Sequence, residues 1–161
     1  MEVEMSIRGL MVDPLTNMPI VMLHDPNGER VLPIWVGIFE ANSIALQIEN
    51  VPSPRPMTHD LLRNVIQDLR GEVTKVVVSD VKESTFYATI HLRVADKPVV
   101  IDARPSDAIA LALRAKAPIF AEETVIEKAK SLEGKPAEGD SERLQKWLEN
   151  LDSEELGKYK M

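Results

Sequence analysis

Carboxylates, arginines and a histidine of the types that could hydrolyse a phosphodiester bond are found at several places between residues 40 and 107. Two stretches, RPMTHDLL at 55–62 and ARPSDAIALALR at 103–114, each contain Arg-Pro, a hydroxyl residue, an Asp and an apolar run. Such hydrolysis needs an activated water, a stabilised transition state and a protonated leaving group, commonly through carboxylate-held Mg²⁺ with a His nearby. The candidate residues are Glu40, His59, Asp60, Asp102 and Asp107, with Arg55 and Arg104 as phosphate partners.

Residue type suggests a role for each candidate, although no spacing among them is diagnostic by itself. His59 is the first choice for acid/base work, and Asp60, Asp107 and Glu40 are further catalytic candidates. The predicted ligands of a Mg²⁺ or Mn²⁺ ion are Asp60, Asp102 and Asp107.

Helix capping offers a structural alternative for the same two stretches. Thr58 and Ser106 each precede an apolar run, as N-cap residues do, and Asp60 and Asp107 would then suit the positive end of a helix dipole. Capping alone could therefore explain why the pattern occurs twice.

Glu40 also has a structural alternative. It lies between Phe39 and an apolar helix, and a charge beside a core is costly unless it is paired. We expect Arg55 or Arg104 to be its counter-ion, in preference to a metal.

Composition limits the class of protein. The chain has 161 residues, 44% of them hydrophobic, which suits one domain with a real core and an appendage. It contains no cysteine, the start MEVEMSIRGL has acids where a signal peptide needs bases, and no apolar run is long enough for a membrane span, so we expect a cytoplasmic protein. The net charge of −7 argues against a broad basic face, so any nucleic-acid contact must be local.

The order of elements indicates a duplicated unit. Alternating patterns predict strands at 1–13, 18–25, 31–37, 73–81, 85–94 and 98–103, and helical periodicity predicts helices at 39–50, 58–70 and 106–115. A short extended piece and a surface helix follow at 118–134. At an offset of 65, the stretch 33–46 matches 98–111, so each half reads as three strands and a helix.

The predicted fold is therefore α+β, with layers in which the helices at 39–50 and 106–115 are packed against sheets. Both helices are apolar nearly all round and must be covered on more than one side. We expect a domain at 1–133, a linker at 134–140 and a helical tail at 141–161. In that tail Leu144, Trp147, Leu148 and Leu151 form one apolar stripe that would dock on this domain or on a neighbouring subunit.

The sequence resembles the bifunctional nuclease domain family over nearly all of residues 1–130. The resemblance rests on VLPIWVGIFEANSIAL (31–46), RPMTHDLL (55–62), TFYATI (85–90) and IDARPSDAIALALR (101–114). It implies an α+β fold of two repeats, a homodimer or higher homo-oligomer, and, for plant relatives, a nuclease that acts on RNA and DNA. The repair-protein motif that some members carry at the C-terminus is not recognisable here.

Two functions from different classes remain open at this point. The first is a metal-assisted nuclease that hydrolyses phosphodiester bonds in RNA or DNA through a local site, without a membrane partner. The second is a non-catalytic oligomeric module that binds a protein partner or a small ligand. The family resemblance favours the first, whereas the acidity and the lack of a diagnostic metal motif favour the second.

Overall fold

A computed structural model describes residues 1–132 of the chain. The predicted linker at 134–140 and the predicted tail at 141–161 lie outside the described residues. None of the helices in the described part is long and apolar enough to cross a membrane.

The elements follow the predicted order closely. In chain order they are β1 (Glu2–Val12), β2 (Pro19–His24), β3 (Val31–Trp35), α1 (Ile38–Ile48), α2 (Thr58–Asp68), β4 (Gly71–Lys82), β5 (Thr85–Val94), β6 (Lys97–Ala103), α3 (Pro105–Ala115), β7 (Ile119–Glu122) and α4 (Glu123–Leu132). The α+β class is thereby confirmed.

All the strands of the described part form one sheet, in the order β3-β2-β1-β7-β4-β5-β6. In each half, three consecutive strands pair antiparallel as a meander, and a helix follows the third strand. This shared connectivity is what the offset-65 match predicts. The short strand β7 joins the halves, because it runs antiparallel to β1 and parallel to β4.

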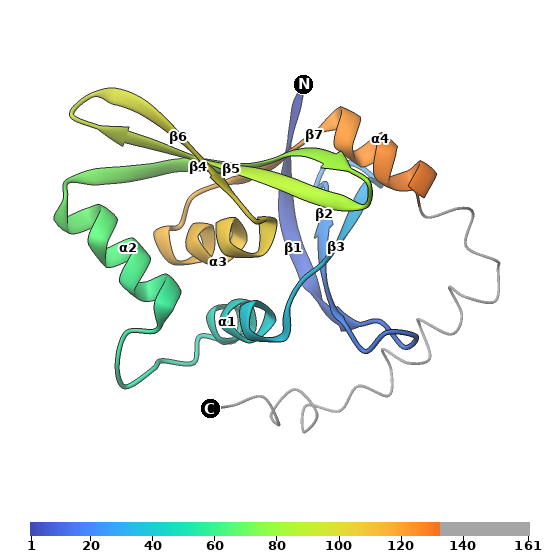
Figure 1. Ribbon diagram of the computed structural model, residues 1–161, viewed down its shortest axis with the longest axis horizontal. Helices are drawn as coiled ribbons and strands as arrows, with labels where there is room; N and C mark the ends of the chain where they lie inside the picture. Colours follow the sequence, from blue (N-terminus) through green and yellow to red (C-terminus); the bar gives the residue numbers. More distant parts are fainter. Residues whose placement is uncertain (133–161) are drawn as a thin grey trace.

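Helix α3 forms the centre of the fold. It lies between the sheet strands β4 and β5 on one side and the helices α1 and α2 on the other, as Figure 1 shows. Its apolar residues from Ala108 to Ala112 are all buried, so the all-round apolar pattern of this helix is satisfied.

Helix α1 is less covered than the sequence predicts. Its buried residues are Ala41, Ser43 and Ile44, whereas Ile38, Phe39 and other apolar side chains remain exposed. The reason is that the described part has one sheet, whereas full burial of both helices needs a second layer of cover. Helix α3 packs directly on the strands, and α1 packs on the outer side of α3.

Helix α2 is amphipathic in the reverse sense to that expected for a core helix. Its apolar stripe, Leu61, Leu62, Val65 and Leu69, is exposed, and we call these four residues the outer α2 face. The side of α2 that faces the protein carries His59, which is buried, and Ile66, which packs against the core. A polar group is therefore buried beside an apolar one, and partners on the other helices must explain why.

Candidate active site

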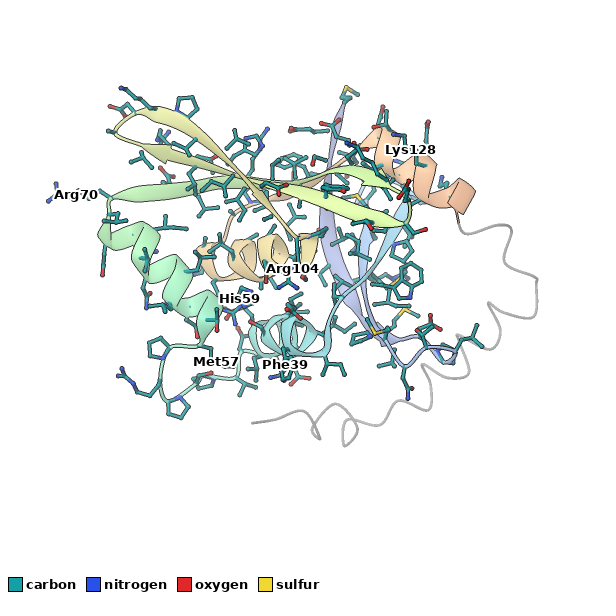
Figure 2. The ribbon with its side chains drawn as sticks, in the orientation of Figure 1. Phe39, Met57, His59, Arg70, Arg104 and Lys128 are labelled. Carbon is teal, nitrogen blue, oxygen red and sulfur yellow. The ribbon has the colours of Figure 1, made fainter. Side chains whose placement is uncertain are left out.

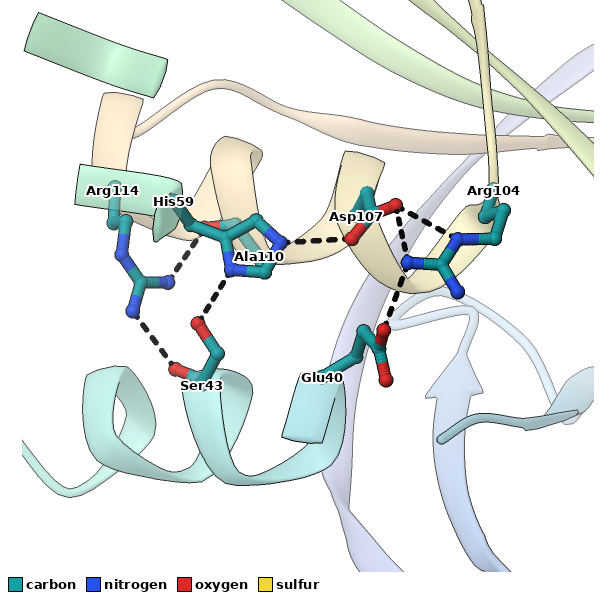
Figure 3. Close-up of polar contacts among 7 residues, drawn as sticks. All are labelled: Glu40, Ser43, His59, Arg104, Asp107, Ala110 and Arg114. Carbon is teal, nitrogen blue, oxygen red and sulfur yellow. Dashed lines mark hydrogen bonds and ion pairs between the residues drawn. The ribbon is translucent and has the colours of Figure 1, made fainter. Parts of the chain in front are cut away.

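Three helices contribute one side chain each to a hydrogen-bonded chain of polar groups. Ser43 Oγ of α1 lies 2.7 Å from His59 Nδ1 of α2, and His59 Nε2 lies 2.9 Å from Asp107 Oδ1 of α3 (Figure 3). Ser43 and His59 are buried, and the side chain of Asp107 is 29% exposed. A hydroxyl, an imidazole and a carboxylate in this order can move or store a proton.

The hydrogen-bond partners define the protonation states available to His59. A carboxylate only accepts, so a neutral His59 carries its proton on Nε2 and donates to Asp107, while Ser43 donates to Nδ1. If His59 takes up a second proton, the Ser43 hydroxyl can accept instead of donate. Both states of His59 are therefore fully hydrogen-bonded, as a proton-transfer group requires.

Arg104 binds Asp107, the carboxylate at the exposed end of the hydrogen-bonded chain. Its Nε lies 2.9 Å from Asp107 Oδ2, and its Nη2 lies 2.8 Å from Glu40 Oε1. The pKa of Arg104 is raised above its ordinary value, first by Asp107 and then by Glu40. Because its side chain is 66% exposed, this guanidinium is the cation that an incoming phosphate could meet. The prediction that an arginine neutralises Glu40 is confirmed.

Gly37 leaves room for the carboxylate of Glu40. A Cβ at position 37 would collide with Glu40 Oε2, which folds back over the start of α1. A side chain there would require the carboxylate of Glu40 to shift.

Arg114 fixes the three helices from the inside. Its side chain is only 2% exposed; Nε donates to Asp60 Oδ1 at 2.6 Å, Nη2 to the Ser43 carbonyl at 3.0 Å, and Nη1 to the Ala110 carbonyl at 2.9 Å. Figure 3 shows the guanidinium beside the Ser43–His59 pair. The buried polar side of α2 is therefore explained by partners on α1 and α3.

The predicted N-caps are wrong, because both helices begin earlier than the capping pattern implies. Met57 is the N-cap of α2 and Arg104 is that of α3, so Thr58 and Ser106 lie inside the first turns. Pro105, whose ring fixes a helical φ, occupies the first position of α3. At α2, Asp60 caps by accepting from the Met57 N–H at 3.0 Å.

Two of the sequence candidates lie outside this group of side chains. Arg55 is exposed in the loop before α2 and makes no hydrogen bond or ion pair with any other residue of 1–132. Asp102 is exposed on β6, opposite Thr89 of β5. Their roles as phosphate partner and metal ligand stay predictions.

The predicted metal ligands do not converge. Asp107 is engaged by His59 and Arg104, Asp60 by Arg114, and Asp102 lies on β6. The described residues hold no group of three or more His, Asp or Glu side chains that could bind a metal ion. These donors therefore do not fit a metal as they stand, and dependence on Mg²⁺ or Mn²⁺ stays a prediction for the assay.

Sequence reasoning missed Ser43 and Arg114. Arg114 is the one polar residue of the stretch AIALALRA, and Ser43 is the one polar residue among the buried residues of α1. A lone polar side chain on a buried helix face requires a partner. That requirement is the signal that could have identified both residues.

Acid should reveal the contribution of Asp60 to stability. Burial raises the pKa of Asp60, but the Met57 N–H and the guanidinium of Arg114 outweigh burial and hold that pKa below its ordinary value of 3.8. The stabilisation is therefore complete above pH 3.8 and is lost as the pH falls through the lower folded-state pKa. We expect Asp60→Asn to unfold at lower urea than the wild type at pH 7, and the gap to narrow at pH 2–3. A gap that stayed constant over this range would contradict the assignment.

The fold and the site together define a class: an α+β domain of two three-strand-plus-helix units, with a hydrogen-bonded Ser–His–Asp chain between its helices. The model of the bifunctional nuclease domain matches residues 21–133, and the chain belongs to this family.

The chain is similar to a bacterial protein over most of its length and to plant nucleases over part of it. An uncharacterized protein of Mycobacterium tuberculosis is 40% identical over 158 residues, which cover 93% of each chain. Bifunctional nuclease 2 of Arabidopsis thaliana is 31% identical over 103 residues, and bifunctional nuclease 1 of Oryza sativa is 28% identical over 105 residues. Each plant match covers 62% of this chain but only 31% of the plant protein.

Proposed function

We propose that the protein hydrolyses phosphodiester bonds of RNA or DNA at the Ser43–His59–Asp107 chain. The supporting observation is that this chain of hydrogen bonds ends at Asp107, which is partly exposed and held beside the exposed Arg104. Membership of the bifunctional nuclease family supports the same class of reaction.

The proposed chemistry depends on which side chains of the site are exposed: Arg104 and Asp107 are, and Ser43 and His59 are buried. Arg104 binds a non-bridging phosphate oxygen, which frees Asp107 Oδ2 to accept a hydrogen bond from the attacking water. As the water oxygen bonds to phosphorus and the bond to the leaving oxygen breaks, the Asp107–His59 pair takes one proton from the water. The pair then gives that proton to the leaving oxygen, so it returns to its starting state. Ser43 is too deeply buried to attack, and it acts by holding His59.

A nuclease assay tests this proposal. Protein cleared of contaminating nucleases is expected to cleave a labelled oligonucleotide, with activity that co-purifies with the protein through a further column. Cleavage is measured with Mg²⁺, with Mn²⁺ and with EDTA, which tests the predicted dependence of the activity on a metal ion. Activity that disappears on further purification would leave the alternative, a non-catalytic binding module.

We also infer that two copies associate through the outer α2 face. Four large apolar side chains are exposed on α2 and its C-cap, and such patches mark interfaces. Leu61, Val65 and Leu69 are spaced symmetrically, so an antiparallel pair of α2 helices would set Val65 against Val65 across a two-fold axis.

A cytoplasmic location of the protein stays a prediction.

A charge on this face should prevent association. We expect Val65→Glu to convert the dimer into a monomer in light scattering, because a carboxylate would be buried without a partner. The control is Val100→Glu on β6, which is 57% exposed against 46% for Val65 and lies outside α2, and should leave the dimer intact. A monomeric wild type, or a dimeric Val65→Glu, would contradict the inference.

A further inference from the structure

Positive charge at the candidate site is limited to a single exposed side chain. Arg114 is buried and neutralised by Asp60, so Arg104 is the only arginine of the site that solvent reaches. Arg104 already faces the carboxylates of Glu40 and Asp107. The site can therefore hold one phosphate, and a second phosphate would meet uncompensated carboxylates.

The rest of the described surface offers little help to a polyanion. Residues 1–132 contain fourteen Lys and Arg against eighteen Asp and Glu. Half of these cations are engaged in ion pairs, namely Arg30, Lys75, Lys82, Arg93, Arg104, Arg114 and Lys128. Phosphate neutralisation by unpaired cations supplies most of the affinity for long nucleic acids, so this surface is poorly suited to them.

One group of cations without ion pairs lies elsewhere. Arg63 and Lys116 line a cleft with Gly71, and Arg70 lies at the same end, which Figure 2 places far from Arg104. Arg70 and Lys116 lie just past the C-terminal ends of α2 and α3, where cations stabilise the helix dipole, and Arg63, in the middle of α2, donates to the side chain of Asn64. Helix stabilisation and this hydrogen bonding account for these residues without a nucleic-acid strand.

We propose that the substrate is a short single-stranded oligonucleotide, down to a dinucleotide, bound through the one phosphodiester that is cleaved. This inference rests on the proposed function and narrows its substrate class. Further nucleotides add repulsion from an acidic surface, on which Arg104 offers no second phosphate contact, and a duplex, with its higher charge density, is bound worse.

The test is the dependence of kcat/KM on substrate length and salt. The substrates are a dinucleotide, a pentamer, a 20-nucleotide strand and a duplex of the same sequence, with rates expressed per scissile bond. We expect the single strands to agree within roughly threefold, and the logarithm of kcat/KM to fall with that of salt with a slope of about −0.7, the value for one phosphate. A gain of tenfold or more from dinucleotide to 20-mer, or a slope of about −3 or steeper, would overturn the inference and leave the proposed function intact.

A matched variant tests whether the distant cations guide a strand. The double variant Arg63→Gln with Lys116→Gln is expected to cleave every substrate as the wild type does, with its fold verified by a thermal melt. Loss of activity on the 20-mer alone would show that the strand runs along this end and would overturn the inference. Failure of the wild type to cleave any substrate would remove the proposed function, and the inference with it.

Discussion

Replacement of Asp107 by Asn is expected to lower phosphodiester cleavage by roughly 10²- to 10⁴-fold, the range for loss of a positioned proton-transfer group. Asn keeps the shape of Asp but cannot share a proton with His59 or balance the charge of Arg104. The measurement is single-turnover cleavage of a labelled oligonucleotide, normalised by the folded fraction from a thermal melt.

A matched control separates this effect from a general change in charge. Asp68→Asn removes the same charge from the exposed last residue of α2 and is expected to retain full activity. Full activity in a folded Asp107→Asn protein would exclude the proposed role. His59→Ala is a less sharp test, because His59 is buried and bonded at both nitrogens, so the change should itself cost about 1–3 kcal/mol of stability.

Arg114→Met is expected to lower the free energy of unfolding by about 3–5 kcal/mol, since it removes one partner of a largely buried ion pair. The loss of the guanidinium leaves Asp60 without its counter-ion, and leaves the Ser43 and Ala110 carbonyls without their donor. Urea unfolding at pH 7 measures the effect. Arg93→Met, which breaks an exposed ion pair with Glu72, should cost less than about 1 kcal/mol.

A second variant distinguishes an uncompensated charge from lost packing. If the carboxylate left behind is the main cost, Arg114→Met combined with Asp60→Leu should recover part of the stability. A double variant no more stable than Arg114→Met would show that the packing of the guanidinium matters more than its charge.

The arrangement within each repeat could be predicted from sequence because its signals are local. Alternating apolar residues, Pro and Gly breakers and the match of Pro33 with Pro98 are all visible along the chain. The position of β7 could not be predicted, since a four-residue strand gains its place from pairing with β1 and β4, which lie far from it in sequence. The orientation of α2 is similar: its stripe predicts an amphipathic helix, but whether that stripe faces inwards depends on polar partners on α3.

The members of the candidate site could be predicted from the sequence, but their contacts could not. The residue types of His59, Asp107, Arg104 and Glu40 select them from the sequence, and the structure brings these four together. Their order of contact depends on how three helices pack, so the sequence could not reveal that Asp60 would turn to Arg114.

The central position of β7 bears on how the chain emerges from the ribosome. Both meanders and their helices are complete at residue 115, but the strand that joins them ends only at Glu122. Until then β1 and β4 each present an open edge, the kind of surface through which nascent chains aggregate. Charged side chains of β1 and β4 lie along those edges, with Glu2, Glu4 and Lys75 among them, and can discourage pairing between nascent chains during that interval. Synthesis of β7 then covers residues 2–5 of β1 and 76–78 of β4 at once, so the last strand to be made joins the two halves of the sheet.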